Sequence, residues 1–425
     1  MRTPLGGVDA FHLVNDRVMR SRGLAGNHCL FVVAVEGRLD VSALLHRIER
    51  ATTLLPELRR ELVLSPAGPY WREAPSPRAE LRVRSIDDAD LGSTLEALVD
   101  QRVGPERPWA ATLLRAKAGD VFVWHWFHPL SDAKGAERFV TWLGGGGASG
   151  PSDPPPAEER SDSGTRPLAK LDRKARLDLT RAYGNHMLKL ARKPIVSLTS
   201  LGGKLGRTRT LRVQLSQDET SAFDARVRQR AKLAETSVMV LVATRLFDAI
   251  VGSRGLAPAQ HLIPVPLSLD PKAFATRLFG NNLTMMTFSL GRDDLADLGR
   301  AIASLADQQR AIVKEKLDTG MLASLDFAKV VPAGPYHWFL TRPFGGEVSS
   351  FVFSNPGAVT LSTFADLAVR DAFALPSVAA PPGFQVIFSR HGGRLSAFIG
   401  FAEGLLWPAE ERALAQLLRA ELLGF

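Results

Sequence analysis

The sequence predicts an α+β protein made of two globular parts joined by a linker. Strand-like and helix-like apolar patterns are mixed along the whole chain, without the regular alternation that is typical of a parallel α/β sheet. Residues 144–167 contain almost no apolar side chains, which predicts a flexible linker. The chain has 425 residues, of which 45% are hydrophobic and 23% charged, so it is long enough for two cores.

The part before the linker is predicted to contain strands and helices in mixed order. The strand segments are residues 28–37, residues 80–86 and a hairpin over residues 109–128, and the helices are residues 40–55 and 91–103. Asp40 is the expected N-cap of the first helix, because its carboxylate can accept main-chain hydrogen bonds there. The hairpin is expected to turn at Gly119 and Asp120.

A basic segment, residues 168–209, follows the linker and is predicted to be helical as far as Lys193. It has eleven Lys and Arg against Asp172 and Asp178, an excess of nine that equals the net charge of +9 of the whole chain. The strands expected beyond it are residues 210–216, 261–269, 282–290, 348–355 and 383–402, and the helices are residues 218–233, 237–252 and 408–423. The predicted division is therefore 1–145, 146–209 and 210–425.

Composition restricts the class of protein. The first residues lack the basic end and long apolar stretch of a secretory signal, and no apolar run is expected to span a bilayer, because Arg245 and Asp248 interrupt the best one. The single cysteine, Cys29, cannot form an internal disulfide, which fits a reducing cytoplasm. We expect a cytoplasmic protein, and the basic segment favours a peripheral position at a membrane surface.

His128 ends the apolar run of residues 121–128. In a strand over these residues Trp126 and His128 share one face, and Pro129 ends the hydrogen-bonded ladder directly after the histidine. A neutral imidazole at such a position is a good proton acceptor, because burial disfavours its charged form. The alternative is a core histidine bonded to a main-chain carbonyl, and position alone does not exclude it.

Asp132 follows His128 by four residues, a spacing that is common by chance. His12 and Asp16 repeat it near the N-terminus, where it only places two side chains on one helix face, so no chemistry is expected from that pair. His125 and His128 face opposite sides of a strand, so no metal site is expected. The glycines near residue 202 lack the following Ser or Thr of a phosphate loop, and no Gly-x-Ser-x-Gly elbow occurs.

“FHPLSDA”, residues 127–133, resembles the His-His-x-x-x-Asp-Gly signature of the thioester-dependent acyltransferase superfamily. This superfamily includes condensation domains of peptide synthetases and wax ester synthase/diacylglycerol acyltransferases. Six further segments, in the expected order, resemble the wax ester synthase branch most. They are “PLGGVDAFHL”, “VEGRLDVSALLHRIERATTLLPELRREL”, “ERPWAATLL”, “LIPVPLSL”, “FGNNL” and “FSNPG”. The resemblance thus covers nearly the full length of the chain.

This resemblance implies two subdomains like chloramphenicol acetyltransferase, set in a V with a tunnel between them and His128 at its middle. Residues 1–145 would form the N-terminal acyltransferase subdomain, residues 146–209 the linker and a basic helical crossover, and residues 210–425 the C-terminal subdomain. The fold class expected is therefore α+β with two such subdomains.

The resemblance also implies the role of each site residue. His128 would be the general base that takes a proton from the acceptor and passes it to the leaving thiolate. Asn281 would donate to the oxyanion, although “GNN” is also an ordinary turn sequence. Asp132 would hold the loop through an ion pair with Arg277. The residues expected to bind substrate are Asn282, Ser354, Asn355, Gly135 and Trp126.

Two departures from the signature leave a noncatalytic alternative open. Phe127 replaces the first histidine and Ala133 replaces the glycine. A relative with these changes can bind a thioester without turning it over. No metal and no bound cofactor are expected. The expected co-substrate is acyl-CoA or an acyl carrier protein thioester.

The function predicted from the sequence is acyl transfer from a CoA thioester to the hydroxyl of a hydrophobic alcohol, as in lipid biosynthesis. The alternative enzyme is a stand-alone condensation enzyme that joins carrier-bound thioesters to an alcohol or amine. Residues 168–209 have three interpretations: a helix on a membrane or lipid-droplet surface, an attraction for CoA phosphates or an acidic carrier protein, or a solvated helix. Nucleic acid is not expected, because few aromatic residues interleave with the cations.

Overall fold

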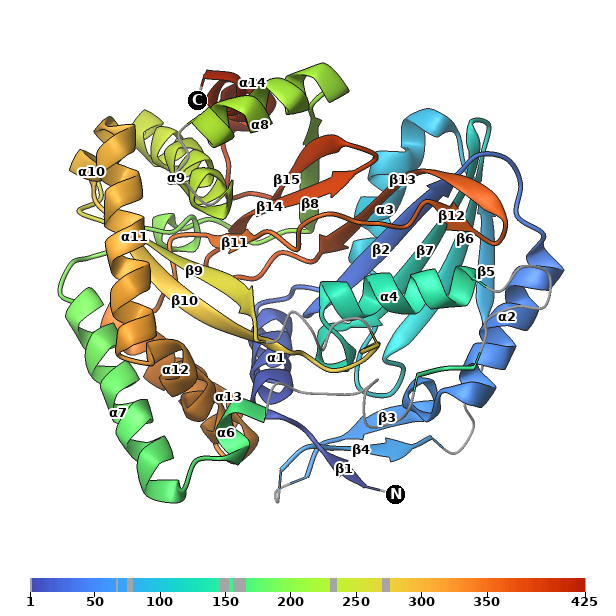
Figure 1. Cartoon of the computed structure of the whole chain (residues 1–425), viewed down its shortest axis with the longest axis horizontal. Coiled ribbons are helices and arrows are strands. Elements are labelled where there is room, and N and C mark those ends of the chain that lie inside the picture. Colours follow the sequence, from blue (N-terminus) through green and yellow to red (C-terminus); the bar gives the residue numbers. More distant parts are fainter. Residues whose placement is uncertain are drawn as a thin grey trace.

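The computed structural model describes residues 2–65, 68–74, 79–145, 153–155, 166–229, 235–269 and 276–424. Most of the predicted linker, residues 144–167, lies outside the described residues. Helices make up 46% and strands 26% of the structure, and the predicted α+β class is confirmed. Figure 1 shows a large sheet on the right, a group of helices on the left, and helix α1 (Gly7–Ser21) between them.

The largest sheet has six strands and contains the apolar run that ends at His128. In spatial order the strands are β12 (Thr363–Phe364), β13 (Leu367–Pro376), β2 (His28–Val35), β7 (Gly119–Phe127), β6 (Trp109–Ala116) and β5 (Leu81–Ser85). β2 and β7 are buried at every residue. Both faces of the sheet are covered, which explains why these strands are continuously apolar rather than alternating.

Helices cover the two faces of this sheet. On one face Phe31 of β2 belongs to the same core as residues of α2 (Val41–Leu54) and α4 (Ala133–Gly144). On the other face Val32 packs with α3 (Leu91–Val99) and with Phe398 from the C-terminal half. The N-terminal core therefore continues across the boundary between the two halves.

Two local predictions can be checked in this half. Asp40 is the N-cap of α2, as predicted, and its side chain accepts a hydrogen bond from Ala43 N at 2.8 Å. The β6–β7 hairpin turns two residues earlier than predicted, because Ala116 pairs with Gly119. Gly119 has a φ of 130°, and a Cβ there would lie 2.3 Å from the main-chain oxygen of Val35, so the glycine is needed for close packing rather than for the turn.

The C-terminal half has its own sheet and core. The strands of its four-stranded sheet, in order, are β11 (Val352–Ser354), β14 (Phe384–His391), β15 (Arg394–Ala402) and β8 (Thr208–Gln214), and a separate pair is β10 (Leu283–Leu290) with β9 (His261–Ser268). The helices packed with it include α8 (Gln217–Gln229), α9 (Glu235–Ser253), α10 (Arg292–Ala296), α11 (Leu298–Lys314) and α14 (Pro408–Gly424).

Helix α9 corrects one expectation about membranes. By length and composition alone it could cross a bilayer, which the sequence argument excluded. However, 61% of its most apolar 18-residue window is buried inside the protein, as in the core helix of a globular domain. Val238, Leu241 and Phe247 of this helix belong to the C-terminal core.

Strands β12 and β13 were not predicted, and they cross the division proposed at residue 210. β13 pairs antiparallel with β2, and Ala372 lies opposite Val33. The C-terminal half of the chain thus supplies two strands to the N-terminal sheet. The division of the chain at the linker does not coincide with the division into sheets.

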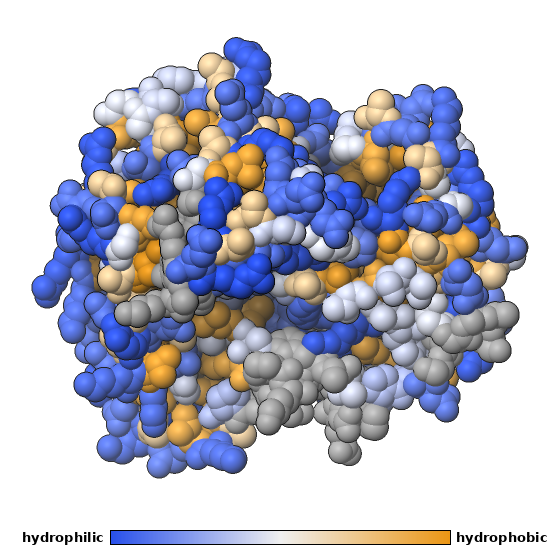
Figure 2. Space-filling view, turned by 45° about the horizontal axis from the view of Figure 1, so that its top comes forward, coloured by the Kyte–Doolittle hydropathy of each residue, from blue (hydrophilic) through white to orange (hydrophobic). Residues whose placement is uncertain are grey.

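The remaining elements lie around α1 and at the lower edge of Figure 1. The helices are α6 (Arg166–Ala169), α7 (Arg173–Leu190), α12 (Leu317–Leu325) and α13 (Ala333–Thr341), with η7 (Asp326–Lys329) between the last two, and a small sheet has the order β1 (Thr3–Pro4), β4 (Tyr70–Glu73) and β3 (Arg60–Val63). α7 is the basic helix predicted from the sequence, and it packs on α12. Figure 2 shows a largely hydrophilic surface with apolar residues between the polar ones.

Candidate active site

His128 is fixed by its main chain at the end of β7. It begins the short 3-10 helix η3 (His128–Leu130), and its N–H donates to the carbonyl of Asn27 at 3.1 Å. Its own carbonyl accepts from Ser131 N at 3.2 Å and from Asn281 Nδ2 at 3.0 Å. Pro129 follows and has no N–H to continue the ladder. The imidazole therefore leaves the chain where the strand ends, as predicted.

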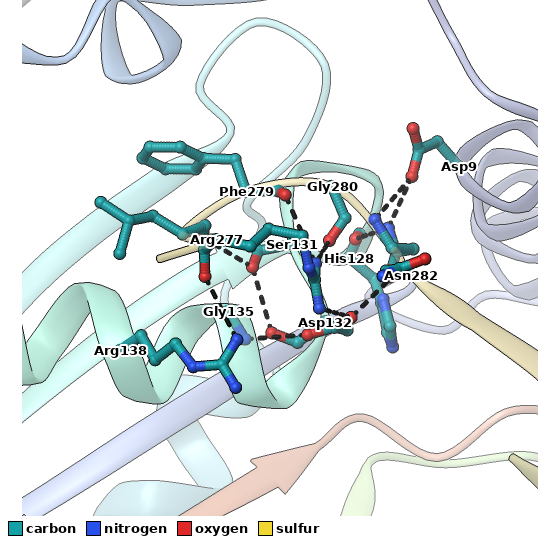
Figure 3. Close-up of polar contacts among 12 residues, drawn as sticks. Asp9, His128, Ser131, Asp132, Gly135, Arg138, Arg277, Phe279, Gly280 and Asn282 are labelled. Carbon is teal, nitrogen blue, oxygen red and sulfur yellow. Dashed lines mark hydrogen bonds and ion pairs between the residues drawn. The ribbon is translucent and has the colours of Figure 1, made fainter. Parts of the chain in front are cut away.

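Asp132 and Arg277 form the ion pair that the family resemblance implied. Arg277 Nη2 lies 2.7 Å from Asp132 Oδ2 (Figure 3). Both residues are buried. Asp132 Oδ2 also accepts from Asn282 N at 3.1 Å, while Oδ1 accepts from Gly135 N at 2.8 Å and caps α4. All of these contacts hold the chain, so Asp132 ties the end of β7 to residues 277–282.

Asn281 lies against His128, but its amide group is already engaged. Nδ2 donates to Asp9 Oδ1 at 2.8 Å and to the carbonyl of His128 at 3.0 Å. Both amide hydrogens are used, so the prediction that Asn281 donates to an oxyanion is corrected. In this arrangement Asn281 fixes the main chain at His128, and an oxyanion would need another donor.

Asp9 is a buried carboxyl group that the sequence argument did not single out. It lies in the first turn of α1, and its Oδ1 also accepts from Asn281 N at 3.2 Å (Figure 3). Burial raises its pKa to about 7, and the hydrogen bonds from Asn281 act in the opposite direction without cancelling this effect. Asp9 is therefore a group that can change its charge near neutral pH.

His12, which was predicted to have no chemistry, lies directly against His128. The two imidazole rings are stacked, with centroids 3.7 Å apart and planes inclined by 12°. His12 Nδ1 is 3.1 Å from Asn27 Nδ2, and that nitrogen also donates to the carbonyl of His12 at 3.1 Å. The helix predicted around His12 and Asp16 is confirmed as α1. This helix brings His12 against His128, a contact that the spacing in the sequence did not indicate.

Both histidines are held in the neutral form. Burial lowers the pKa of His128, although Asp132 and Asn281 act against this effect. Burial, together with the neighbouring His128, lowers the pKa of His12 well below its usual range. His128 Nδ1 is buried and has no hydrogen-bond partner among the described residues. A neutral ring of this kind can accept a proton.

The His128 ring lines a cavity of about 420 Å³, which lies in the usual size range of sites for small molecules. The wall includes residues from both halves of the chain, and most of its surface is apolar. Apolar side chains in it include Val8, Phe11, Met187, Met285, Leu325 and Leu340. Tyr183 and Met187 show that the basic helix α7 forms part of this wall, a role that its charge did not predict.

No family model matches the sequence, and no curated protein matches it significantly. The fold, in contrast, is similar to solved structures over the whole chain. The first condensation domain of the calcium-dependent antibiotic synthetase, in complex with a substrate analogue, aligns with a TM-score of 0.72 at 12% identity, covering 100% of this chain and 97% of that chain. The chain has the fold of the condensation and acyltransferase superfamily.

Two further solved structures share this fold. The wax ester synthase/diacylglycerol acyltransferase from Marinobacter aquaeolei VT8 aligns with a TM-score of 0.63 at 15% identity, covering 99% of this chain and 98% of that chain. Trichothecene 15-O-acetyltransferase from Fusarium sporotrichioides aligns with 0.70 at 14% identity, covering 99% and 95%. At these identities the similarity extends to the fold alone. The TM-scores do not favour the wax ester synthase branch that the sequence segments resemble.

The predicted substrate-binding residues occupy different parts of this superfamily fold. Asn282, Ser354, Asn355 and Trp126 line the cavity. Trp126 is otherwise committed to the core, since it is fully buried and its Nε1 donates to Ser131 O at 2.8 Å. Gly135 is placed differently: its N–H is used by Asp132, so it is not free to bind an oxyanion.

The two departures from the superfamily signature affect packing. Phe127 is fully buried in the core of the N-terminal half. Ala133 is the first residue of α4 and lines the cavity, and its helical position does not require the freedom of a glycine. Both residues are compatible with the position of His128 described above.

Cys29 lies nearer to the site than its place in the sequence suggested. It is opposite Trp126 in the β2–β7 pairing, and it lines the cavity. Burial raises the pKa of its thiol, so the reactive thiolate is disfavoured. Among the described residues no group of three or more His, Cys, Asp or Glu side chains could hold a metal ion.

Proposed function

We propose that this protein transfers an acyl group from a thioester to a hydroxyl or amino group, with His128 as general base. The observation that carries the proposal is a neutral imidazole on the wall of a largely apolar cavity, in a residue whose main-chain N–H and carbonyl are both hydrogen-bonded. A positioned base of this kind typically contributes about 10²–10⁴-fold to a rate. The superfamily fold supports the same class of reaction.

The proposed reaction needs one proton carrier. His128 Nε2 takes the proton of the acceptor as its oxygen or nitrogen attacks the thioester carbonyl. The tetrahedral intermediate then collapses, the C–S bond breaks, and the proton on Nε2 passes to the leaving thiolate. No acyl-enzyme is required, which agrees with the high pKa that burial gives Cys29.

We propose a hydrophobic acyl chain or acceptor as substrate, because apolar side chains make up most of the cavity wall. The proposed donor is an acyl-CoA and the proposed acceptor a hydrophobic alcohol, as in the wax ester synthase/diacylglycerol acyltransferase type. The second candidate is condensation of a carrier-bound thioester. The condensation domain aligns with a higher TM-score than the wax ester synthase/diacylglycerol acyltransferase, 0.72 against 0.63, and this supports the second candidate.

The test measures free thiol released from a panel of acyl-CoAs with long-chain alcohols, and from the same acyl groups on a carrier protein. We expect release with the wild type and a loss of about 10²–10⁴-fold with His128→Ala. His46→Ala, an exposed histidine on α2, is the matched control and should keep the wild-type rate. Release that is equal in the wild type and His128→Ala would refute the catalytic role. Release from carrier-bound donors alone would select the condensation enzyme.

A binding measurement addresses the noncatalytic alternative. Titration calorimetry with a non-hydrolysable acyl-CoA analogue should give the same affinity for the wild type and His128→Ala if the base acts only in the reaction. Tight binding without any thiol release from either donor class would identify a thioester-binding protein instead of an enzyme.

We also propose that α7 contacts an anionic lipid surface, in the cytoplasm. The helix has no fully buried residue, and Leu177 and Leu188 are 47% and 57% exposed beside its cations. Sedimentation with anionic and with neutral vesicles tests this. We expect binding to the anionic vesicles only, weakened in Leu188→Glu, whereas no binding to either would reject the lipid contact.

A further inference from the structure

We propose that His12 is a positioning residue of the active site, which holds the catalytic ring of His128 by stacking on it. This inference rests on the proposed acyl transfer at His128 and adds a second histidine to it. The rings are 3.7 Å apart at their centroids and nearly parallel, at 12°. At this distance neither ring can turn about its side-chain bonds without displacing the other.

The His12 ring is itself held in place. The carbonyl of His12 can only accept a hydrogen bond, so the nitrogen of the Asn27 amide must face it at 3.1 Å. The same Asn27 Nδ2 lies 3.1 Å from His12 Nδ1, which must therefore accept its other hydrogen. A neutral His12 consequently carries its proton on Nε2.

Asn27 connects both histidines to the Asp16–Arg20 ion pair of α1. Its main-chain N–H donates to Asp16 Oδ1 at 2.9 Å, and its carbonyl accepts the N–H of His128 at 3.1 Å. Asp16 Oδ2 accepts from Arg20 Nε at 2.8 Å. Asp16, which shares a helix face with His12, thus orients Asn27. One amide residue fixes the ring of His12 and the main chain of His128 together.

The close approach of this loop requires a glycine next to Asn27. Gly26 has a φ of 117°, and a Cβ there would lie 2.3 Å from Asp16 Oδ1 and 2.6 Å from Arg20 Nη2. A side chain at residue 26 would clash with the side chains of Asp16 and Arg20, and Asp16 is the residue that accepts the N–H of Asn27. The glycine therefore allows this loop to approach Asp16 and Arg20 of α1 closely.

The imidazole that stacks on His128 comes from α1 and not from residues 127–133, the segment that resembles the superfamily signature. The position directly before His128 holds Phe127, whose side chain is fully buried in the core. His12 supplies an imidazole beside His128 from a distant part of the chain. We infer that the stack, together with Asn281 on the main chain, keeps Nε2 of His128 aimed into the cavity.

The kinetic test compares His12→Ala with His12→Phe. His12→Ala removes the stacked ring and should lower kcat by about 10- to 100-fold. KM should change little, because the orientation of the base is lost while the substrate still binds. His12→Phe keeps a flat ring and should recover a large part of kcat. Asn27→Ala, which releases the His12 ring, should fall between wild type and His12→Ala. His46→Ala is again the control.

A double variant separates positioning from general damage to the fold. In a His128→Ala background the His12→Ala change should lower the residual rate no further, since there is no ring left to position. A further loss of tenfold or more in that background, or wild-type kcat in His12→Ala, would overturn the inference.

A spectroscopic measurement keeps the inference separate from the proposed reaction. The ring ¹H and ¹³C signals of His128, assigned with His128→Ala, should shift in His12→Ala because the ring current of the stacked imidazole is lost. Unchanged signals would overturn the stack even if the enzyme were active. Shifted signals in a protein without thiol release would reject the acyl transfer and leave the stacked pair established.

Discussion

Asp132 and Arg277 lie 145 positions apart in the chain, yet Oδ2 and Nη2 are 2.7 Å apart in the buried interior. The pair joins the segment after β7 to the segment before β10. It thus connects the two halves of the chain directly beside His128.

Asp132→Ala should lower the free energy of unfolding by about 3–5 kcal/mol, because it removes the carboxylate that lies 2.7 Å from the buried guanidinium of Arg277. Urea denaturation monitored by tryptophan fluorescence measures this. In the double variant Asp132→Ala/Arg277→Met the loss should be smaller than the sum of the two single losses. As a control, Asp178→Ala breaks exposed pairs with Lys174 and Arg181 and should change stability by less than about 1 kcal/mol. Equal losses at both sites would contradict the buried pair.

The pH dependence of the proposed transfer reaction should follow the depressed pKa of His128. The base must be neutral, and burial moves its pKa below the ordinary imidazole value of about 6.5. We therefore expect kcat/KM to stay constant as the pH falls from 8 toward 6.5 and to decrease only below that. A profile of kcat/KM with an acid limb centred at or above 6.5 would contradict a buried base.

Asp9→Asn should stabilise the protein more at pH 8 than at pH 4, relative to wild type. The folded pKa of Asp9 is raised to about 7 by burial, so the folded state binds a proton that the unfolded state releases near pH 4. Stability from this group is full below the unfolded value and is lost as the pH rises through 7. The difference is at most about 4 kcal/mol. Thermal unfolding of both proteins at several pH values measures it, and parallel curves would show that Asp9 titrates normally.

Gly135→Ala should be destabilising by about 1–3 kcal/mol, because the new methyl group has no room. Its Cβ would lie 2.3 Å from Ser131 Oγ and 2.9 Å from the carbonyl of Leu278. Gly184→Ala in α7 is the matched control, since nothing lies within 4 Å of a Cβ there. That change should stabilise the helix by up to about 1 kcal/mol. Chemical denaturation of the two variants checks the contrast, which would disappear if residue 135 had space.

Local signals in the sequence predicted much of the fold. The N-cap at Asp40, the β6–β7 hairpin and the apolar strand before His128 depend on neighbouring residues, so patterns over short windows detect them. β13 was missed because Arg370 and Asp371 interrupt its apolar pattern and a bulge lies between Val369 and Asp371. Asp371 is tolerated in the strand because Arg212 of β8 pairs with it, and no local pattern reveals such a partner.

In the candidate site, too, local motifs could be recognised in the sequence, whereas contacts between distant segments could not. His128, Asp132 and Arg277 could be named in advance because the motif and the glycine-asparagine segment resemble a family signature. His12 and Asp9 could not, since their roles depend on where α1 docks against η3 and residue 281. Asn281 was placed correctly beside the histidine, but its donors were assigned to substrate although the fold itself uses them.

The pairing of β13 with β2 has a consequence for biosynthesis. During translation β2 and β7 leave the ribosome long before residue 376, and until then one edge of β2 has no neighbour. We expect the N-terminal sheet to stay incomplete until β12 and β13 are synthesised. Its exposed edge makes the nascent chain prone to association, so it needs protection by chaperones. Cutting the gene at the linker should therefore give two insoluble fragments that recover the native fold only when they are made together.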